Sequence, residues 1–534
     1  MNRRDLVGKM TALASGGLLL NSTTARASEN FEVNSYVTVY DVRKYGAKGD
    51  GKTNDVVAIQ KAIDACSKGG GGVVLFDKGT FLSGGIKLKS HVELHISSTA
   101  VLLGTRNVKD YNHDTNFKQG GGIRSFINAD NCHHIAITGS GMVNGQGEAF
   151  PATSGYSVRP YLVYFRSCKD IRITNITLHN SAVWICWLLQ CERVKLQGVT
   201  MDNPVSPNRD GIDLDGCRDV HISDSVFKTE DDSIAFKVSE KGFPCRDITV
   251  TNCILSSKCA AIRFGPDAID NIENITISNC VIRDTRLNGI KIQESMGATM
   301  RNITFSNIVM DNVVGPVSIR CAGWQLEQGD TAPFEINDSN WANGKIHNIL
   351  FNNITGTTPE KNHAVSITGT TQTRPRDITF SNIDITYTGG GTTQQGARRE
   401  VPDLDRHYPE IYIFGDLPAY AFYIHHASGL VFDNVTIRLQ SDDMRPAFVC
   451  DDVDNLEFSG LKVAGAKTAE SVIRFQNTRN VFINASRTLN ETGTFLRVEG
   501  AMSRDILLSN NKFNTVSKVV ETTSDVSKDA VAQR

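Results

Sequence analysis

Apolar and polar residues alternate in short stretches along most of the chain, which is the period-2 pattern of β-strands. One phrase recurs, in which an acidic or amide residue is followed by four alternating residues and then by an amide, as in Asp170-Ile-Arg-Ile-Thr-Asn175 and Asn302-Ile-Thr-Phe-Ser-Asn307. The sixth residue of each phrase marks a column along the chain: Gly139, Asn175, Gly198, Asp224, Asn252, Asn279, Asn307, Asn353, Asn382, Asn434, Gly460, Ala485 and Asn510.

Members of this column are mostly about 25 residues apart, and such a repeat with two or three short strands per unit is typical of a solenoid. We therefore predict an all-β fold, a single-stranded right-handed parallel β-helix over residues 35–520, with coils stacked about 4.8 Å apart. Like residues then stack on like, and the column predicts an internal asparagine ladder. The chain carries no leucine-rich-repeat or propeller signature.

Three gaps in the column are longer and predict insertions near residues 144–160, 315–345 and 387–420, which can shape a binding surface. Residues 53–67 carry apolar side chains at helical spacing, with Thr53, Asn54 or Asp55 able to cap the helix and Gly69 ending it. We expect this helix to cover the open end of the β-helix, where unpaired strand edges invite aggregation. Residues 521–534 are expected to be a frayed polar tail.

Paired arginines, an apolar run from Met10 to Leu20 and a small-x-small site at Ala25-Arg26-Ala27 predict an export signal over residues 1–27. The paired arginines favour the twin-arginine route, although a general secretory signal is an open alternative. A periplasmic or extracellular location is therefore expected.

Twelve cysteines in an exported chain raise the question of disulfides. Five of them stand two residues before a repeat phrase and so form a column: Cys132, Cys168, Cys191, Cys217 and Cys245. Buried packing is favoured over disulfide pairing, because free cysteine behaves as a small buried hydrophobe. No CxxC motif or His/Cys cluster at ligand spacing occurs, so neither a metal nor a cofactor is predicted.

The formal net charge of −2 over 534 residues argues against a nucleic-acid partner, which requires a surplus of positive charge. No run of eighteen apolar residues follows the N-terminal segment, so no membrane span is expected.

Candidate chemistry lies at Asp210 and at the pair Asp231-Asp232, which are about one coil apart and should lie on adjacent coils of one face. Hydrolysis of a glycosidic bond needs two carboxyl groups, one to protonate the leaving oxygen and one to activate water or to attack the sugar. The Asp-Asp dipeptide alone does not indicate a catalytic site, since it also occurs at Asp442-Asp443 and Asp451-Asp452.

Several motifs together resemble glycoside hydrolase family 28, the polygalacturonase and rhamnogalacturonase family. They are Tyr40 to Asp55 with the following helix, Gly141-Met-Val-Asn-Gly145-Gln-Gly147, Asn208-Arg209-Asp210-Gly-Ile, Asp231-Asp232-Ser-Ile-Ala-Phe-Lys237 and, later, Tyr408-Pro-Glu-Ile. The resemblance implies a hydrolase of a pectic or related acidic polysaccharide that inverts the anomeric centre. It implies Asp231 as the general acid and Asp210 and Asp232 as the holders of the water, with Asn208, Arg209 and Lys237 beside the substrate.

The sequence departs from the family pattern modestly at Arg209, where the family has Thr, and more strongly in two other places. The family's Gly-His-Gly aligns with Cys259-Ala260-Ala261, and its Arg-Ile-Lys aligns with Lys291-Ile292-Gln293. Strand alternation places Arg263, Lys291 and Gln293 on the outer face, where we expect them to contact an acidic sugar. Basic and aromatic residues of the third insertion could close one end of the substrate-binding cleft that this outer face would form, which would make the enzyme exo-acting. They are Arg398, Arg399, Arg406, His407 and Tyr408.

Two other functions stay open: a β-helix that binds glycans without cleaving them, and a lyase that uses Ca²⁺ or a base such as Lys291. The sequence leaves open the sugar cleaved, exo or endo action, and the oligomeric state.

Overall fold

The computed structural model describes residues 37–114, 122–151, 153, 155–203, 207–324, 341–359 and 363–534. Residues Thr38–Arg534 form one compact unit. The predicted export signal at residues 1–27 lies outside the described residues and stays a prediction. No helix in the described ranges is long and apolar enough to cross a membrane.

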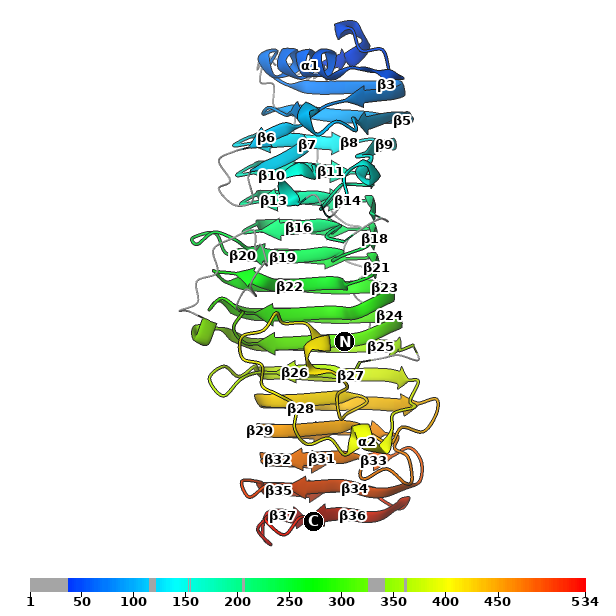
Figure 1. The fold of residues 1–534 in the computed structure, drawn as a ribbon, viewed down its shortest axis with the longest axis vertical. Coiled ribbons are helices and arrows are strands. Elements are labelled where there is room, and N and C mark those ends of the chain that lie inside the picture. The colour runs from blue at the N-terminus through cyan, green and yellow to red at the C-terminus, as the bar shows by residue number, and fades with distance from the viewer. Residues whose placement is uncertain are drawn as a thin grey trace, which may run out of the picture. The chain divides into compact units, whose positions relative to one another are not determined.

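Strands of the unit Thr38–Arg534 pair in parallel with strands one coil further along the chain, so that the coils stack on one another (Figure 1). One ladder contains β4 (Ile86–Lys87), β7 (Ile123–Asp130), β10 (Tyr161–Arg166), β13 (Cys186–Leu189), β16 (Ile212–Asp215), β19 (Ile234–Val238), β22 (Ala260–Ala268), β26 (Val365–Thr368), β31 (Ile473–Gln476), β34 (Thr492–Glu499) and β36 (Val516–Thr522). A second contains β5 (Val92–Gly104), β8 (His133–Thr138), β11 (Lys169–Thr174), β14 (Glu192–Gln197), β17 (Arg218–Ser223), β20 (Cys245–Thr251), β25 (Lys345–Thr357), β27 (Arg376–Tyr387), β32 (Arg479–Asn484), β35 (Arg504–Ser509) and β37 (Val531–Gln533). A third contains β9 (Met142–Asn144), β12 (Thr177–His179), β15 (Thr200–Asn203), β18 (Val226–Thr229), β21 (Ile254–Ser257), β30 (Lys462–Val463) and β33 (Arg487–Thr488).

Several long strands run through more than one ladder without a break. Those that include part of the first ladder are β23 (Ile272–Glu294), β24 (Thr299–Cys321), β28 (Phe422–Leu439) and β29 (Phe448–Ser459), whereas β5, β25 and β27 run through the second and third. The chain enters through β1 (Val39–Asp41), β2 (Asp50–Asn54) and β3 (Gly72–Ser83), while β6 (Asn112–Asp114) pairs antiparallel with β7. The predicted parallel β-helix is confirmed.

The column of turn residues explains why the repeat is so regular. All of its members have positive φ, from 51° at Asn434 to 111° at Gly139, and the first residues of the phrases, such as Asp170 and Asn302, do as well. Asparagine, aspartate and glycine tolerate this left-handed conformation, so each phrase is a short strand between two sharp corners. The asparagine ladder forms, with Asn307 Nδ2 donating to Asn279 Oδ1 at 3.0 Å, but it lies on the exposed side of the coils rather than inside them as expected.

Apolar stacks fill the interior of the coils. Phenylalanine rings lie face to face on successive coils, with centroids 4.6 to 5.4 Å apart, along Phe305, Phe351, Phe380 and Phe432. The predicted cysteine column is buried beside them, and all twelve cysteines are free thiols. Such close stacking favours apolar residues of similar shape on neighbouring coils.

The predicted helix is α1 (Val56–Lys68), which buries Ile59, Ile63 and Cys66 against the first coil at one end of this unit (Figure 1). Asp55 precedes it, and its carboxylate accepts hydrogen bonds from the Lys48 and Gly49 amides rather than capping α1.

The insertions and the tail differ from the expected bounds. Strand β24 continues to Cys321, so the second insertion starts later than residue 315, and its residues 325–340 lie outside the described residues. The first insertion contains short 3₁₀ turns at Gly147–Ala149 and Tyr156–Val158. The expected polar tail at 521–534 contains β37, which pairs with β35, and buries Ala530, so strand pairing extends into it.

The third insertion lies across the outer face of the first ladder, and we call residues 388–420 the covering segment. It contains a short helix α2 (Thr393–Gly396) and a 3₁₀ turn η7 (Ile411–Phe414), and it is the yellow chain in front of the strands in Figure 1. Its apolar residues Ile411, Phe414 and Leu417 pack on Tyr423 and Val449 of the strands beneath. This contact places the covering segment over the cations that were expected to meet the substrate.

Candidate active site

The three candidate aspartates lie in the turns that enter β16 and β19. These strands pair in parallel with Ile212 opposite Ile234, so Asp210 and Asp232 occupy equivalent positions on neighbouring coils. The Gly211 amide donates to the Asp232 carbonyl at 2.9 Å, which ties the two turns together. The predicted adjacency of the three carboxyl groups is therefore observed.

Asp231 is half-buried, and its carboxyl oxygens accept hydrogen bonds from the Asn208 amide at 3.1 Å and the Asp232 amide at 3.0 Å. Burial, together with the neighbouring charge of Asp232, raises the pKa of Asp231 above its ordinary value. This group therefore keeps a proton at a pH where an exposed aspartate has lost it.

Asp232 is buried but has cationic partners. Its Oδ2 accepts from Arg263 at 3.1 Å and its Oδ1 accepts from the Ala260 amide at 3.1 Å. Burial alone raises the pKa, but the positive charges of Arg263 and Lys291 outweigh it and hold the pKa of Asp232 below its ordinary value. The pair thus combines one carboxyl group that favours the protonated form with one that favours the ionised form.

Asp210 lies in a deeper cluster of charges. Burial raises its pKa well above the ordinary value, and the charges of Asp213 and Asp231 add to the shift. Lys237 Nζ lies 3.9 Å from Asp210 and 2.8 Å from Asp213, and its ammonium also sits 3.7 Å from the centroid of the Trp184 ring. Lys237 was expected to contact the substrate, but its side chain is 7% exposed and it balances buried carboxylates instead.

Sequence reasoning missed Asp213, whose pKa rises to about 7 because burial outweighs the charge of Lys237. The alternation in Ile212-Asp213-Leu214-Asp215 was the available signal, since it places both aspartates on the outer face beside Asp210.

Asn208 and Arg209 hold the turn rather than project from it. The Oδ1 of Asn208 accepts from Arg159, and the buried guanidinium of Arg209 donates to Asn180 Oδ1 and to the Gly147 carbonyl. The expected substrate contact by Arg209 is therefore replaced by contacts to preceding coils.

Arg263 and Lys291 do face outward, as alternation predicted, but the covering segment lies over them. Lys291 Nζ donates to both carboxylate oxygens of Glu410 at 2.6 and 2.8 Å, and Arg263 donates to the Tyr408 hydroxyl at 2.8 Å. Lys291 is fully buried and Arg263 is 5% exposed. Neither cation is exposed in this arrangement and Lys291 is paired with Glu410, so the expected contacts of the two cations with an acidic sugar stay a prediction.

Two neighbouring residues complete this buried region. Gln293 donates to the Pro409 carbonyl and accepts from Arg263, so it too is held by the covering segment. Cys259 stands where the family's Gly-His-Gly motif aligns, and its Sγ lies within 4.8 Å of carboxylate oxygens of Asp231 and Asp232. Burial raises the pKa of the Cys259 thiol well above its ordinary value, so a neutral thiol borders the carboxyl pair.

A groove of about 560 Å³ opens beside the turn that carries Asp231. The hydroxyls of Thr229 and Ser257, which line it, both donate to the Asp231 carbonyl, at 2.6 and 2.7 Å. A second depression of about 570 Å³ shares Arg286 and Val314 with the first. Arg286 is exposed, so it offers a cation to both hollows.

Known proteins resemble this chain in sequence and in fold. The model of the family described as Glycosyl hydrolases family 28 matches residues 66–401. Exopolygalacturonase clone GBGE184 from Arabidopsis thaliana is 27% identical over 417 residues, which cover 73% of this chain and 91% of the relative. Endo-xylogalacturonan hydrolase A from Aspergillus tubingensis is 26% identical over 334 residues, covering 59% of this chain and 77% of the relative.

Among solved structures, the family 28 exopolygalacturonase of Yersinia enterocolitica superposes with a TM-score of 0.60 at 22% identity and covers 76% of each chain. The exopolygalacturonase of Thermotoga maritima gives a TM-score of 0.57 at 22% identity, covering 66% of this chain and 87% of the other. These similarities support the β-helix fold, and the family model covers well over half of the chain. The chain belongs to family 28 of the glycosyl hydrolases and is a polygalacturonase-like glycosidase.

Proposed function

We propose that the enzyme hydrolyses a pectic or related acidic polysaccharide by an inverting mechanism with Asp231 as the general acid. The observation that carries this proposal is the opposite direction of the pKa shifts in the adjacent pair, raised at Asp231 and lowered at Asp232. Glycosidic cleavage requires a protonated donor and an ionised acceptor at one site, and environments that push two pKa values apart assign these roles.

In the proposed reaction, Asp231 transfers its proton to the oxygen of the leaving sugar as the glycosidic bond breaks. Asp232 accepts a proton from the water that attacks the anomeric carbon from the opposite side. Asp210, whose pKa burial raises, is the neutral partner that orients this water by a hydrogen bond.

The pH dependence of kcat/KM follows from these shifts. Activity rises as Asp232 ionises, below the usual range for aspartate, and falls as Asp231 loses its proton, above that range. Because Arg263 holds the pKa of Asp232 down, Arg263→Met is expected to move the acid limb of the profile to higher pH. Initial rates across a pH series would measure this shift, and an acid limb at its wild-type position would contradict the proposed role of Asp232.

The substrate carboxylates need a cation other than the buried Arg263 and Lys291, and Arg286 is our candidate because it lines both grooves. Arg286→Ala is expected to raise KM for polygalacturonan about 10-fold with a smaller change in kcat, since one charged hydrogen bond is lost. Methyl-esterified polygalacturonan, which lacks the charge, should be affected less.

Digestion of polygalacturonan, its methyl ester and rhamnogalacturonan, with product sizing, tests both substrate class and Arg286. Arg283→Ala is the matched control, because Arg283 is exposed on the same strand but lines neither groove. Equal effects of the two substitutions would remove Arg286 from the substrate site, and release of no reducing ends from any acidic polymer would contradict the proposed function.

A further inference from the structure

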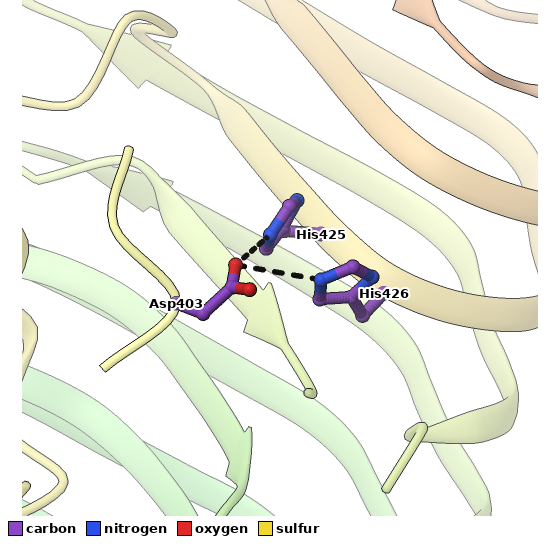
Figure 2. A group of neighbouring side chains, drawn as sticks. All are labelled: Asp403, His425 and His426. Carbon is purple, nitrogen blue, oxygen red and sulfur yellow. Dashed lines mark hydrogen bonds and ion pairs between the residues drawn. The ribbon is translucent and has the colours of Figure 1, made fainter. Parts of the chain in front are cut away.

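Three side chains outside the active site converge where the covering segment meets β28. The Asp403 carboxylate of the covering segment faces the rings of both His425 and His426 (Figure 2). Asp403 Oδ1 lies 2.7 Å from His425 Nε2 and 3.4 Å from His426 Nε2. Each histidine side chain is 10% exposed, whereas the Asp403 side chain is 44% exposed.

The backbone explains how two consecutive histidines reach one carboxylate. Side chains of successive strand residues normally point to opposite faces. His426 has a φ of 51°, in the left-handed region, and this corner turns its ring to the same side as His425. The ring centroids are consequently only 3.9 Å apart.

The next coil supplies a carboxylate to the other nitrogen of each ring. Strand β29 places Asp451 opposite His425, and Asp452 follows it beside His426. His426 Nδ1 lies 2.7 Å from Asp452 Oδ2, and His425 Nδ1 lies 3.3 Å from Asp451 Oδ2. Arg374 and Arg479 also bind Asp452, so this carboxylate is held in place and ionised.

When both imidazoles are neutral, this arrangement leaves electron-rich atoms facing one another. In the tautomer that directs its Nδ1 proton at Asp452, His426 presents the lone pair of Nε2 to Asp403 Oδ1, 3.4 Å away, and this buried nitrogen makes no hydrogen bond within the described part of the chain. One oxygen atom, Asp403 Oδ1, faces both Nε2 atoms. A single cation between the three atoms would satisfy all of them at once, whereas without it each of the two imidazoles needs its own proton on Nε2 to bind Asp403 Oδ1.

We propose that Asp403, His425 and His426 bind a divalent transition-metal ion of the Zn²⁺ class through Oδ1 and the two Nε2 atoms. Two imidazoles and one carboxylate form a common zinc ligand set, with water in the fourth position, and second carboxylates on the distal nitrogens orient such rings. Ligands at 2.0–2.1 Å in a tetrahedron are about 3.3 Å apart. The His426 distance already fits, and the 44% exposed Asp403 side chain is free to move outward from His425.

Such an ion would fasten the covering segment to β28. Asp403 is five residues before Tyr408, which contacts the Arg263 that holds Asp232. The ion would therefore fix the segment that closes over the buried cations.

The proposal is tested by isothermal titration of Zn²⁺ into the full-length protein, from which metal has first been removed with a chelator and by dialysis. One equivalent is expected to bind, to raise Tm and to slow proteolysis within the covering segment. Asp403→Asn and the double variant His425→Gln/His426→Gln should each weaken binding at least 10-fold while the metal-free Tm of Asp403→Asn stays close to that of the wild type.

The matched control is His133→Gln/His134→Gln, an adjacent histidine pair that is exposed and whose rings are 5.4 Å apart. It should retain full binding and the full rise in Tm. The proposal is overturned if the wild type binds no Zn²⁺, or if the Asp403 and His425/His426 variants bind it as tightly as the wild type.

Discussion

Asp231→Asn is expected to lower kcat by about 10³-fold on every polymer that the wild-type enzyme cleaves, with Tm unchanged. General acids contribute about 10² to 10⁴ in rate, and the amide cannot donate a proton to the leaving oxygen. The amide oxygen can still accept the hydrogen bond from the Asn208 amide, so the turn should keep its shape. Release of reducing ends and a thermal melt measure the two quantities.

Asp442→Asn is the matched control, because Asp442 is the exposed member of another Asp-Asp pair and lies on a distant coil. It should leave both activity and Tm unchanged. Full activity of Asp231→Asn on all substrates would remove Asp231 from the role of general acid, and joint loss of activity and folding would mark it as structural.

Glu410→Ala is expected to lower the free energy of unfolding by about 3–5 kcal/mol, since it removes one partner of a buried ion pair. Lys291 would be left fully buried with no carboxylate on its ammonium, and Arg263 would lose a carboxylate at 3.6 Å. Burial alone lowers the pKa of Lys291, but the charge of Glu410 outweighs burial and holds this pKa above its usual value. Lys291 is therefore a cation in the folded state. Urea denaturation measures the change.

Replacing both partners, as in Lys291→Met/Glu410→Leu, should recover most of this loss, because apolar residues of similar volume need no charge compensation. Glu491→Ala removes one partner of the exposed pair Lys467–Glu491 and should cost no more than about 1 kcal/mol. Wild-type stability of Glu410→Ala together with a raised KM would show that Lys291 meets the substrate and not the covering segment.

Much of the fold was predictable because the repeat is marked by residues that tolerate the left-handed backbone conformation at corners. The phrase from Asp170 to Asn175 has a corner at each end, and the same spacing recurs on successive coils. Such local constraints act within one coil and are visible as a period in the sequence. The insertions lack this period, and the bounds of the second one accordingly differed from the prediction.

The site was predictable only in part, for a physical reason. Alternation places Arg263 and Lys291 on the outer face, but it cannot tell what lies over that face. The residue that pairs with Lys291 is Glu410, 119 positions later in a segment without a repeat. Similarly, the spacing from Asp210 to Asp232 predicts that they are neighbours, while the protonation of each depends on buried groups such as Lys237.

The covering segment also bears on how the β-helix unfolds. In a solenoid each coil contacts only its neighbours, so coils can open one by one from an end. Here Tyr408 binds Arg263 of β22 and Arg399 binds Glu499 of β34, which joins coils that are far apart in the stack. The coils from β22 to β34 should therefore exchange their amide protons as one cooperative unit, while those before β22 open independently.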